Sequence, residues 1–129
     1  MSVVAVDSHD RTPIYAQLDR GLRAAIASGR LRAGDQLPTV RQLAVELRVN
    51  ANTVARVYCE LERAGVLETR RGVGSFVRAS AEQARPPDEH ERRLCAFVNE
   101  ILARASAAGF GVDEIVSRVN EHRTKRSDL

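Results

Sequence analysis

Residues 39–77 read TVRQLAVELRVNANTVARVYCELERAGVLETRRGVGSFV. Within this stretch, apolar residues recur at intervals of three and four over residues 40–47 and again over residues 54–61, which predicts two amphipathic helices. Only Arg48-Val49-Asn50 separates the two patterns. Two helices joined by so short a turn are typical of a helix-turn-helix.

The ends of these two helices carry recognisable signals. Thr39 and Gln42 have the spacing of a capping box at the start of the first helix. Asn50 is a suitable N-cap for the second helix. We expect that helix to run to about Ala64, because Gly65 is a typical C-terminal stop.

Two short β-prone segments follow the second helix. Residues 66–71 and 75–78 flank Gly72-Val73-Gly74, and this arrangement predicts a hairpin with a tight turn. A hairpin directly after a helix-turn-helix forms a wing. The predicted fold is therefore mainly α with a small β-hairpin, a winged helix-turn-helix followed by a C-terminal pair of helices.

The rest of the chain divides around this motif. A helix that opens at Thr12-Pro13 and ends at Ser28-Gly29 completes the winged domain. Asp88 is a predicted N-cap for a later helix, and the end of the chain from Arg123 is charged and expected to fray. We expect a flexible arm at 1–11, the DNA-binding domain at 12–78, a linker at 79–87 and a two-helix dimerisation region at 88–129.

The two C-terminal helices each carry an apolar stripe that this small region cannot bury alone. The simplest partner is the same region of a second subunit; the alternative is that the stripes pack back on their own winged domain. The residues predicted to dimerise are Leu94, Phe97, Val98, Ile101, Leu102, Ile115, Val116 and Val119.

The second helix of the helix-turn-helix has an outer face suited to the major groove. On a helical wheel the residues that face the core are Val54, Val57, Tyr58 and Leu61. Asn52 and Arg56 lie opposite, with Thr53 at the edge. Asparagine can bond adenine, arginine can bond guanine through two atoms, and threonine can reach a phosphate or a thymine methyl group.

Other residues support DNA binding, and two of them have competing interpretations. Asn50 has capping as its main expected role, and Arg56 has the spacing for an ion pair with Glu60. Arg41 begins the helix that crosses the DNA backbone in such motifs. The predicted DNA-binding residues are Thr39, Arg41, Asn50, Asn52, Thr53, Arg56, Arg70, Arg71, Gly72 and Gly74.

The charge is unevenly distributed along the chain. Residues 11–85 hold 13 arginines against 7 acidic residues, whereas residues 86–129 hold 7 basic and 8 acidic residues. A basic module joined to a near-neutral one predicts an anion-binding domain followed by an assembly region.

The composition limits the classes of protein that need considering. The 129 residues are 43% hydrophobic and 29% charged, which predicts one soluble domain with a small appendage. No signal peptide or membrane span is expected, and two cysteines without a CxxC pair predict a reducing, cytoplasmic setting. Cys59 is expected on the outer helix face as a bystander thiol or a redox switch, and Cys95 is expected to be buried.

A resemblance to a known family supports this interpretation. Residues 13–77 resemble the DNA-binding domain of the GntR family of bacterial regulators, and the short C-terminal region resembles its YtrA-like subfamily. The segments that carry the resemblance are 13–18, 29–31, 34–44, 50–54, 61–62, 65–67 and 72–77. The resemblance implies that a homodimer binds operator DNA through Arg41, the start of the helix predicted at 51–64, and the wing tip. It also implies that the targets are transporter operons.

The chain departs from the family pattern at Ala51 and Ala55, where many members have arginine. Specificity is therefore expected to rest on Asn52, Thr53 and Arg56. No catalytic or metal-binding spacing is present, so we expect no enzyme activity and no cofactor. The predicted function is a repressor that binds double-stranded operator DNA, with a small-molecule effector as a possible further partner. The alternative is a winged-helix adaptor that binds protein without base readout.

Overall fold

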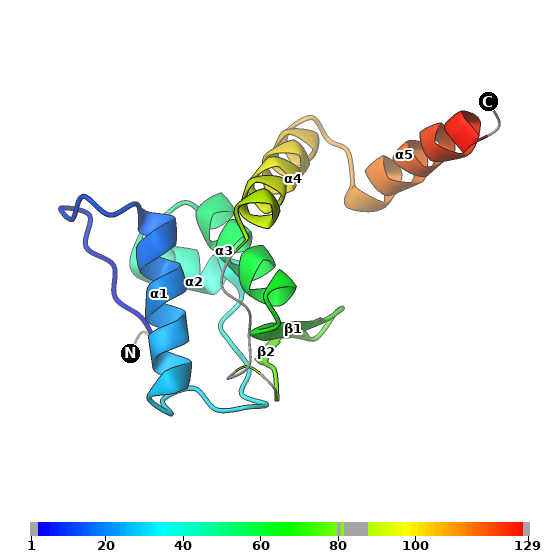
Figure 1. Cartoon of the computed structure of the whole chain (residues 1–129). Coiled ribbons are helices and arrows are strands. Elements are labelled where there is room, and N and C mark those ends of the chain that lie inside the picture. The colour runs from blue at the N-terminus through cyan, green and yellow to red at the C-terminus, as the bar shows by residue number, and fades with distance from the viewer. Residues whose placement is uncertain (1–2, 80, 82–87, 128–129) are drawn as a thin grey trace.

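The structure is a computed structural model that describes residues 3–79, 81 and 88–127 (Figure 1). Most of the linker predicted at 79–87 lies outside the described residues. The elements, in chain order, are α1 (Ile14–Ala27), α2 (Val40–Leu47), α3 (Ala51–Arg63), β1 (Leu67–Arg70), β2 (Gly74–Val77), α4 (Glu89–Ala107) and α5 (Val112–Ser127). The order of helices and strands confirms the predicted winged helix-turn-helix with two helices after it.

The core lies where the apolar stripes of α1, α2 and α3 meet. On each of the three helices the core residues share helical spacing, which is why one face of that helix is buried, and Leu67 of β1 joins them. The side chains that are almost wholly buried are Leu18, Leu22, Leu43, Val54, Val57, Leu61 and Leu67. The hydroxyl of Tyr58 donates a hydrogen bond to the carbonyl oxygen of Pro38 over 2.7 Å, and burial raises the pKa of Tyr58.

The turn between α2 and α3 forms as predicted. The amide of Gln42 donates to Oγ1 of Thr39 over 3.1 Å, and the amide of Thr39 donates to Oε1 of Gln42 over 2.9 Å, so the capping box is complete. Arg48 ends α2 in the left-handed conformation, with φ of 57°. Oδ1 of Asn50 accepts the amide of Asn52 over 2.8 Å, which caps α3.

The wing, residues 67–77, is an antiparallel hairpin in which Leu67 pairs with Val77 and Arg70 with Gly74. A third segment lies along β2, since the amide of Leu37 donates to Ser75 and the amide of Val77 donates to Asp35. The sequence predicted only a connector there. A segment this short has no readable periodicity, so its pairing with β2 depends on the tertiary fold.

Two predictions about the chain ends are wrong. The arm predicted to be flexible packs on α1, because Val4 is only 6% exposed and fills the space that a side chain at Gly21 would occupy. The amide of Asp7 also donates to Oε1 of Gln17 over 2.7 Å. At the other end, α5 continues to Ser127 where fraying was expected from Arg123.

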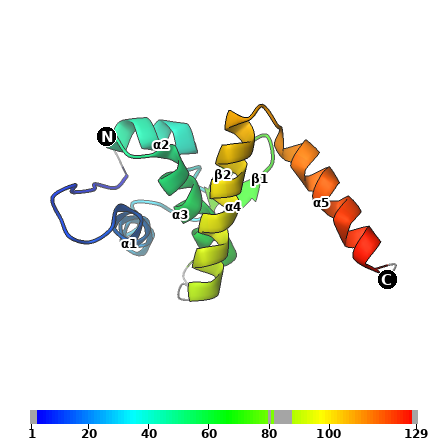
Figure 2. The same ribbon diagram turned by 90° about the horizontal axis from the view of Figure 1, so that it is seen from above.

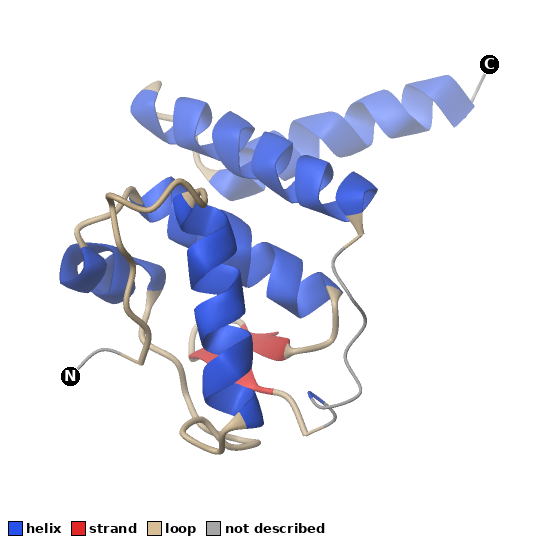
Figure 3. Ribbon diagram, turned by 60° about the vertical axis from the view of Figure 1, so that its left-hand side comes forward, coloured by secondary structure: helices blue, strands red, loops and turns tan. Residues whose placement is uncertain are grey.

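Helix α4 lies across α3, whereas α5 leads away from the winged domain (Figures 1 and 2). Figure 3 shows the same division, with α4 and α5 on one side of the molecule and the hairpin beneath α3. The C-terminal helices therefore form an arm attached to the domain through the third helix. No helix among the described residues is long and apolar enough to cross a membrane.

Candidate nucleic-acid interface

The start of α3 holds the residues predicted to read bases. Asn52 and Thr53 lie in its first turn and are half-buried, and Asn50 and Ala51 before them are exposed. The first turn has no acidic residue. The amide groups at a helix N-terminus favour an anion, so this end can approach a phosphate without opposition from a neighbouring carboxylate.

The start of α2 offers a second basic position. Arg41 is exposed in the first turn of α2, which also has no acidic residue. Thr39 is exposed too, but its hydroxyl oxygen already accepts the amide of Gln42. Among the residues that the structure describes, no ion pair holds Arg41, so its charge at a helix N-terminus is suited to a phosphate contact.

The wing presents two consecutive arginines, Arg70 and Arg71, directly before its tip. The guanidinium of Arg70 lies 4.4 Å from the centre of the Phe76 ring, which orients it on the strand. Nη2 of Arg71 lies 3.2 Å from Oδ1 of Asp113 at the start of α5, and both side chains are about nine-tenths exposed, at 91% and 89%. An ion pair this exposed is weak, so Arg71 can exchange it for a phosphate.

Glycine shapes the wing tip. Gly72 has φ of 79° and Gly74 has φ of 140°, both in the region that favours glycine. A Cβ at Gly74 would stand 2.7 Å from Nε2 of Gln36, and that same nitrogen donates to the carbonyl of Val73 over 3.0 Å. The side chain of Gln36 thus stabilises the wing tip through its hydrogen bond to Val73. The two residues are far apart in the sequence, so spacing did not predict this contact.

The outward placement predicted for Arg56 is wrong. Its Nε donates to Oε1 of Glu60 over 3.2 Å, and its guanidinium stacks 3.9 Å from the centre of the Tyr15 ring. The Arg56 side chain is 27% exposed. The alternative interpretation, an ion pair with Glu60, is confirmed, and Arg56 joins α3 to α1 rather than facing solvent.

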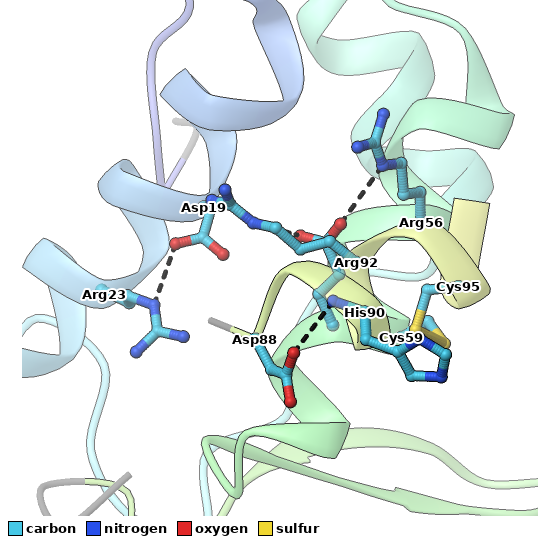
Figure 4. Close-up of polar contacts among 9 residues, drawn as sticks. Asp19, Arg23, Arg56, Cys59, Asp88, His90, Arg92 and Cys95 are labelled. Atoms are coloured by element: carbon cyan, nitrogen blue, oxygen red, sulfur yellow. Dashed lines mark hydrogen bonds and ion pairs between the residues drawn. A yellow bond between two sulfur atoms is a disulfide. The ribbon is translucent and has the colours of Figure 1, made fainter. Parts of the chain in front are cut away.

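Arg56 belongs to a buried ionic cluster between α1, α3 and α4 that the sequence did not predict (Figure 4). Asp19 pairs with Arg23 over 2.9 Å, and Nε of Arg92 lies 3.9 Å from Oε2 of Glu60. Asp19 and Glu60 are only 6% and 4% exposed. The charges come from three helices, so only their packing brings the cluster together.

Burial raises the pKa of the Glu60 carboxyl, and the hydrogen bond and charge of Arg56 together with the charge of Arg92 only partly oppose that effect. Because the folded pKa lies above the unfolded one, the native state binds the proton more tightly. The contribution of Glu60 to stability is therefore fully present below the ordinary carboxyl pKa of about 4 and is lost as the pH rises through the raised value.

We expect Glu60→Gln to remove this pH dependence. The free energy of unfolding of the wild type, measured by urea titration between pH 4 and pH 8, should fall relative to that of the variant as the pH rises. The readout is the difference between the two slopes, so a lower overall stability of the variant does not affect it. Parallel pH profiles for the two proteins would contradict the assignment.

Of the two roles expected for Cys59, a bystander thiol or a redox switch, the structure contradicts the bystander thiol. Cys59 on α3 and Cys95 on α4 form a disulfide, with their Cα atoms 5.9 Å apart (Figure 4). Cys95 is buried, as predicted, and Cys59 is half-buried. The outer face of α3 around Cys59 is covered by α4, which the wheel for an isolated helix could not show.

Most of the predicted dimerisation residues are exposed in the single chain. Phe97 is 61% exposed and Val119 is 55% exposed, and Leu94, Val98, Ile101 and Val116 are between 40% and 50% exposed. Leu102 and Ile115 are half-buried. The alternative, in which these stripes pack back on the winged domain, does not fit this exposure. Among the described residues, no cluster of His, Cys, Asp and Glu could hold a metal ion.

The chain is similar to known regulators along most of its length. The family model described as "Bacterial regulatory proteins, gntR family" matches residues 14–77. HTH-type transcriptional regulator Rv1152 of Mycobacterium tuberculosis is 46% identical over 104 residues, which are 81% of this chain and 80% of that protein. HTH-type transcriptional repressor YtrA of Bacillus subtilis is 39% identical over 80 residues, 62% of each protein. The solved structure of YtrA from Sulfolobus acidocaldarius, a GntR-family transcription factor, gives a TM-score of 0.53 at 30% identity and covers 95% of this chain and 97% of that one.

A winged helix-turn-helix with Arg41 at the start of α2, polar residues at the start of α3 and arginines on the wing defines the class: a DNA-binding transcriptional regulator. The chain belongs to the GntR family, as residues 14–77 and the relatives show. Proteins of this family are regulators rather than enzymes, and the predicted resemblance is confirmed.

Proposed function

We propose that the chain is a transcriptional repressor that binds an inverted-repeat operator as a homodimer. The observation that carries the proposal is the exposed apolar face on α4 and α5, joined directly to the recognition helix α3. A two-fold pairing of that face would place two copies of α3 in one assembly. Two equivalent recognition helices match two equivalent half-sites.

Three groups of residues supply the proposed DNA contacts. The amides and side chains at the start of α3 meet base edges, chiefly through Asn52 and Thr53. The start of α2 and the wing meet phosphates. The residues in these backbone contacts are Thr39, Arg41, Arg70, Arg71, Gly72 and Gly74, and Asn50, the N-cap of α3, adds a contact at the start of that helix. Arg56 is left out of the base-reading set because it is held by Glu60 and Tyr15.

The second copy is the occupant that best fits the exposed face. An apolar stripe on two successive helices, each stripe short and flanked by charged residues, is typical of a helical dimer interface. The charge of residues 86–129, 7 basic against 8 acidic, leaves little net repulsion between two copies. The face lies on α4 and α5, which contain none of the residues proposed to contact DNA, so pairing through it does not use those residues.

Repression is the direction of regulation that we propose. A dimer bound across a promoter would exclude polymerase by occupying the DNA, and the Bacillus relative YtrA is named a repressor. Transcription in vitro from a promoter that contains the bound sequence should fall as the protein is added. A rise in transcript would overturn the proposed sign. Mapping bound sites in cells would show whether they lie upstream of transporter genes, the targets implied by the family resemblance.

The alternative, an adaptor that binds protein without base readout, is disfavoured by family membership, by the absence of acidic residues from the first turns of α2 and α3, and by the exposed Arg41 in the first turn of α2. The two functions differ in one direct way. A base-reading regulator binds a particular duplex with higher affinity than a scrambled duplex, whereas an adaptor without base readout has the same affinity for both.

We expect Arg41→Ala to flatten the plot of log affinity against log salt concentration by about 0.9, because one phosphate contact is lost. The change should be the same on the specific duplex and on scrambled DNA. Arg20→Ala removes an equal charge from the exposed surface of α1 and is the matched control, with no expected change in slope. Equal slopes for Arg41→Ala and the wild type would remove Arg41 from the interface.

A further inference from the structure

The disulfide between Cys59 and Cys95 joins the two functional halves of the molecule. Cys59 lies on the recognition helix, and Cys95 lies on the helix that carries the proposed dimer face. The two residues are 36 positions apart, with the linker between them. Their bond is therefore the covalent connection that fixes how α4 sits on α3.

The polar contacts that also hold α4 to α3 are much weaker. Nε of Arg92 and Oε2 of Glu60 are 3.9 Å apart, and within the described part of the chain neither atom has a hydrogen-bond partner. Cys95 itself is 2% exposed, so its side chain is the best-buried apolar contact that α4 makes. Breaking the disulfide removes the covalent link and leaves the noncovalent packing between α3 and α4, together with the long ion pair between Arg92 and Glu60.

A regulator that acts on bacterial DNA works in a compartment where thiols are kept reduced. Disulfides in such compartments are usually transient and are used for catalysis or for sensing oxidation. We propose that Cys59 and Cys95 form a thiol redox sensor, which couples the oxidation state of the cell to DNA binding. This inference rests on the proposed function, because the sensor reports through the affinity for DNA.

The chemistry needs a low-molecular-weight disulfide as the oxidant. In the reduced protein the half-buried Cys59 is the sulfur that a small reagent reaches first. Its thiolate attacks the reagent, forms a mixed disulfide and releases one small thiolate. The thiolate of Cys95 then attacks the sulfur of Cys59 and releases the second small thiol. Two protein thiols are oxidised, one small disulfide is reduced to two thiols, and an excess of small thiol reverses both steps.

Oxidation should strengthen binding to DNA. In the oxidised state α4 is fixed on α3, so a dimer formed through α4 and α5 holds its two recognition helices at one separation. In the reduced state α4 can shift on α3, so the separation between the two recognition helices varies. Binding to DNA must then select one separation, and this ordering lowers the affinity. Pre-organisation of a binding surface raises affinity. We expect a factor of at least about five, the lower end of typical coupling between sites.

The test uses the full chain in two states, treated with oxidised glutathione or with dithiothreitol. Thiol titration should find two free thiols per reduced chain and none after oxidation, with the oxidised protein running as a single chain on a non-reducing gel. The affinity for a duplex enriched from a randomised pool should be at least about five times higher for the oxidised form, and dithiothreitol should reverse the gain.

Cys59→Ser is the matched variant, because it prevents the bond and leaves the buried Cys95 in place. Its affinity should equal that of the reduced wild type under both treatments. Free thiols that persist after oxidation, chains linked to one another, or equal affinities in the two states would each overturn the sensor. If neither state distinguishes the enriched duplex from a scrambled one, the proposed function fails and the sensor with it, whatever the thiol count.

Discussion

Phe97→Glu is expected to convert the dimer into monomers and to weaken operator binding by a factor of about 10² to 10⁴, because two linked contacts become one. Phe97 is 61% exposed in the single chain, so a carboxylate there does not disturb the winged domain. In the dimer the same carboxylate would be buried in an apolar interface, which is strongly unfavourable. Light scattering gives the mass, and fluorescence anisotropy gives the affinity for the enriched duplex.

The control for this variant lies on the same helix. Ala103 is exposed and lies on a different side of α4 from Phe97, so Ala103→Glu introduces the same charge away from the proposed interface. It should leave both the mass and the affinity unchanged. A Phe97→Glu protein that stays dimeric would show that α4 does not carry the interface.

Asn52→Ala is expected to lower the affinity for the specific duplex by about 1–3 kcal/mol and to leave the affinity for scrambled DNA unchanged. The reason is that an asparagine side chain in the first turn of α3 can bond a base edge through two atoms, whereas its loss removes no charge. Titrations of both duplexes with both proteins at one salt concentration give the ratio of the two affinities. An equal loss on both duplexes would show that Asn52 does not read bases.

Asn50→Ala separates a capping effect from a reading effect. Oδ1 of Asn50 accepts the amide of Asn52, so its removal should lower the free energy of unfolding by about 1 kcal/mol. The ratio of specific to scrambled affinity should hardly change. If Asn50→Ala reduced that ratio as much as Asn52→Ala does, the two side chains would have exchanged their proposed roles.

The parts of the fold that were predicted correctly are those that local chemistry determines. The capping box of Thr39 and Gln42, the cap by Asn50 and the wing turn at Gly72 each depend on residues a few positions apart. Their hydrogen bonds form wherever the sequence places suitable side chains at those spacings. The apolar face on α4 was also predictable, because a periodic stripe needs no knowledge of its neighbours.

The parts that were missed depend on contacts between distant segments. Arg56 stacks on Tyr15 of α1. A helical wheel of α3 contains only residues of α3, so it cannot show this contact. Cys59 meets Cys95 only because α4 crosses α3. Val4 docks because Gly21 leaves space for it on α1. Each of these pairs lacks a fixed sequence spacing, so only tertiary packing reveals it.

The central claim is that a homodimer reads an inverted repeat, and selection of bound duplexes from a randomised pool tests it most directly. Sequencing of the duplexes retained by the full chain should show two half-sites related by a two-fold axis. Their centres should lie about one helical turn, 10–10.5 base pairs, or a multiple of that apart, with two chains bound per duplex. A single unrepeated site bound by one chain, or no enriched sequence, would contradict the claim.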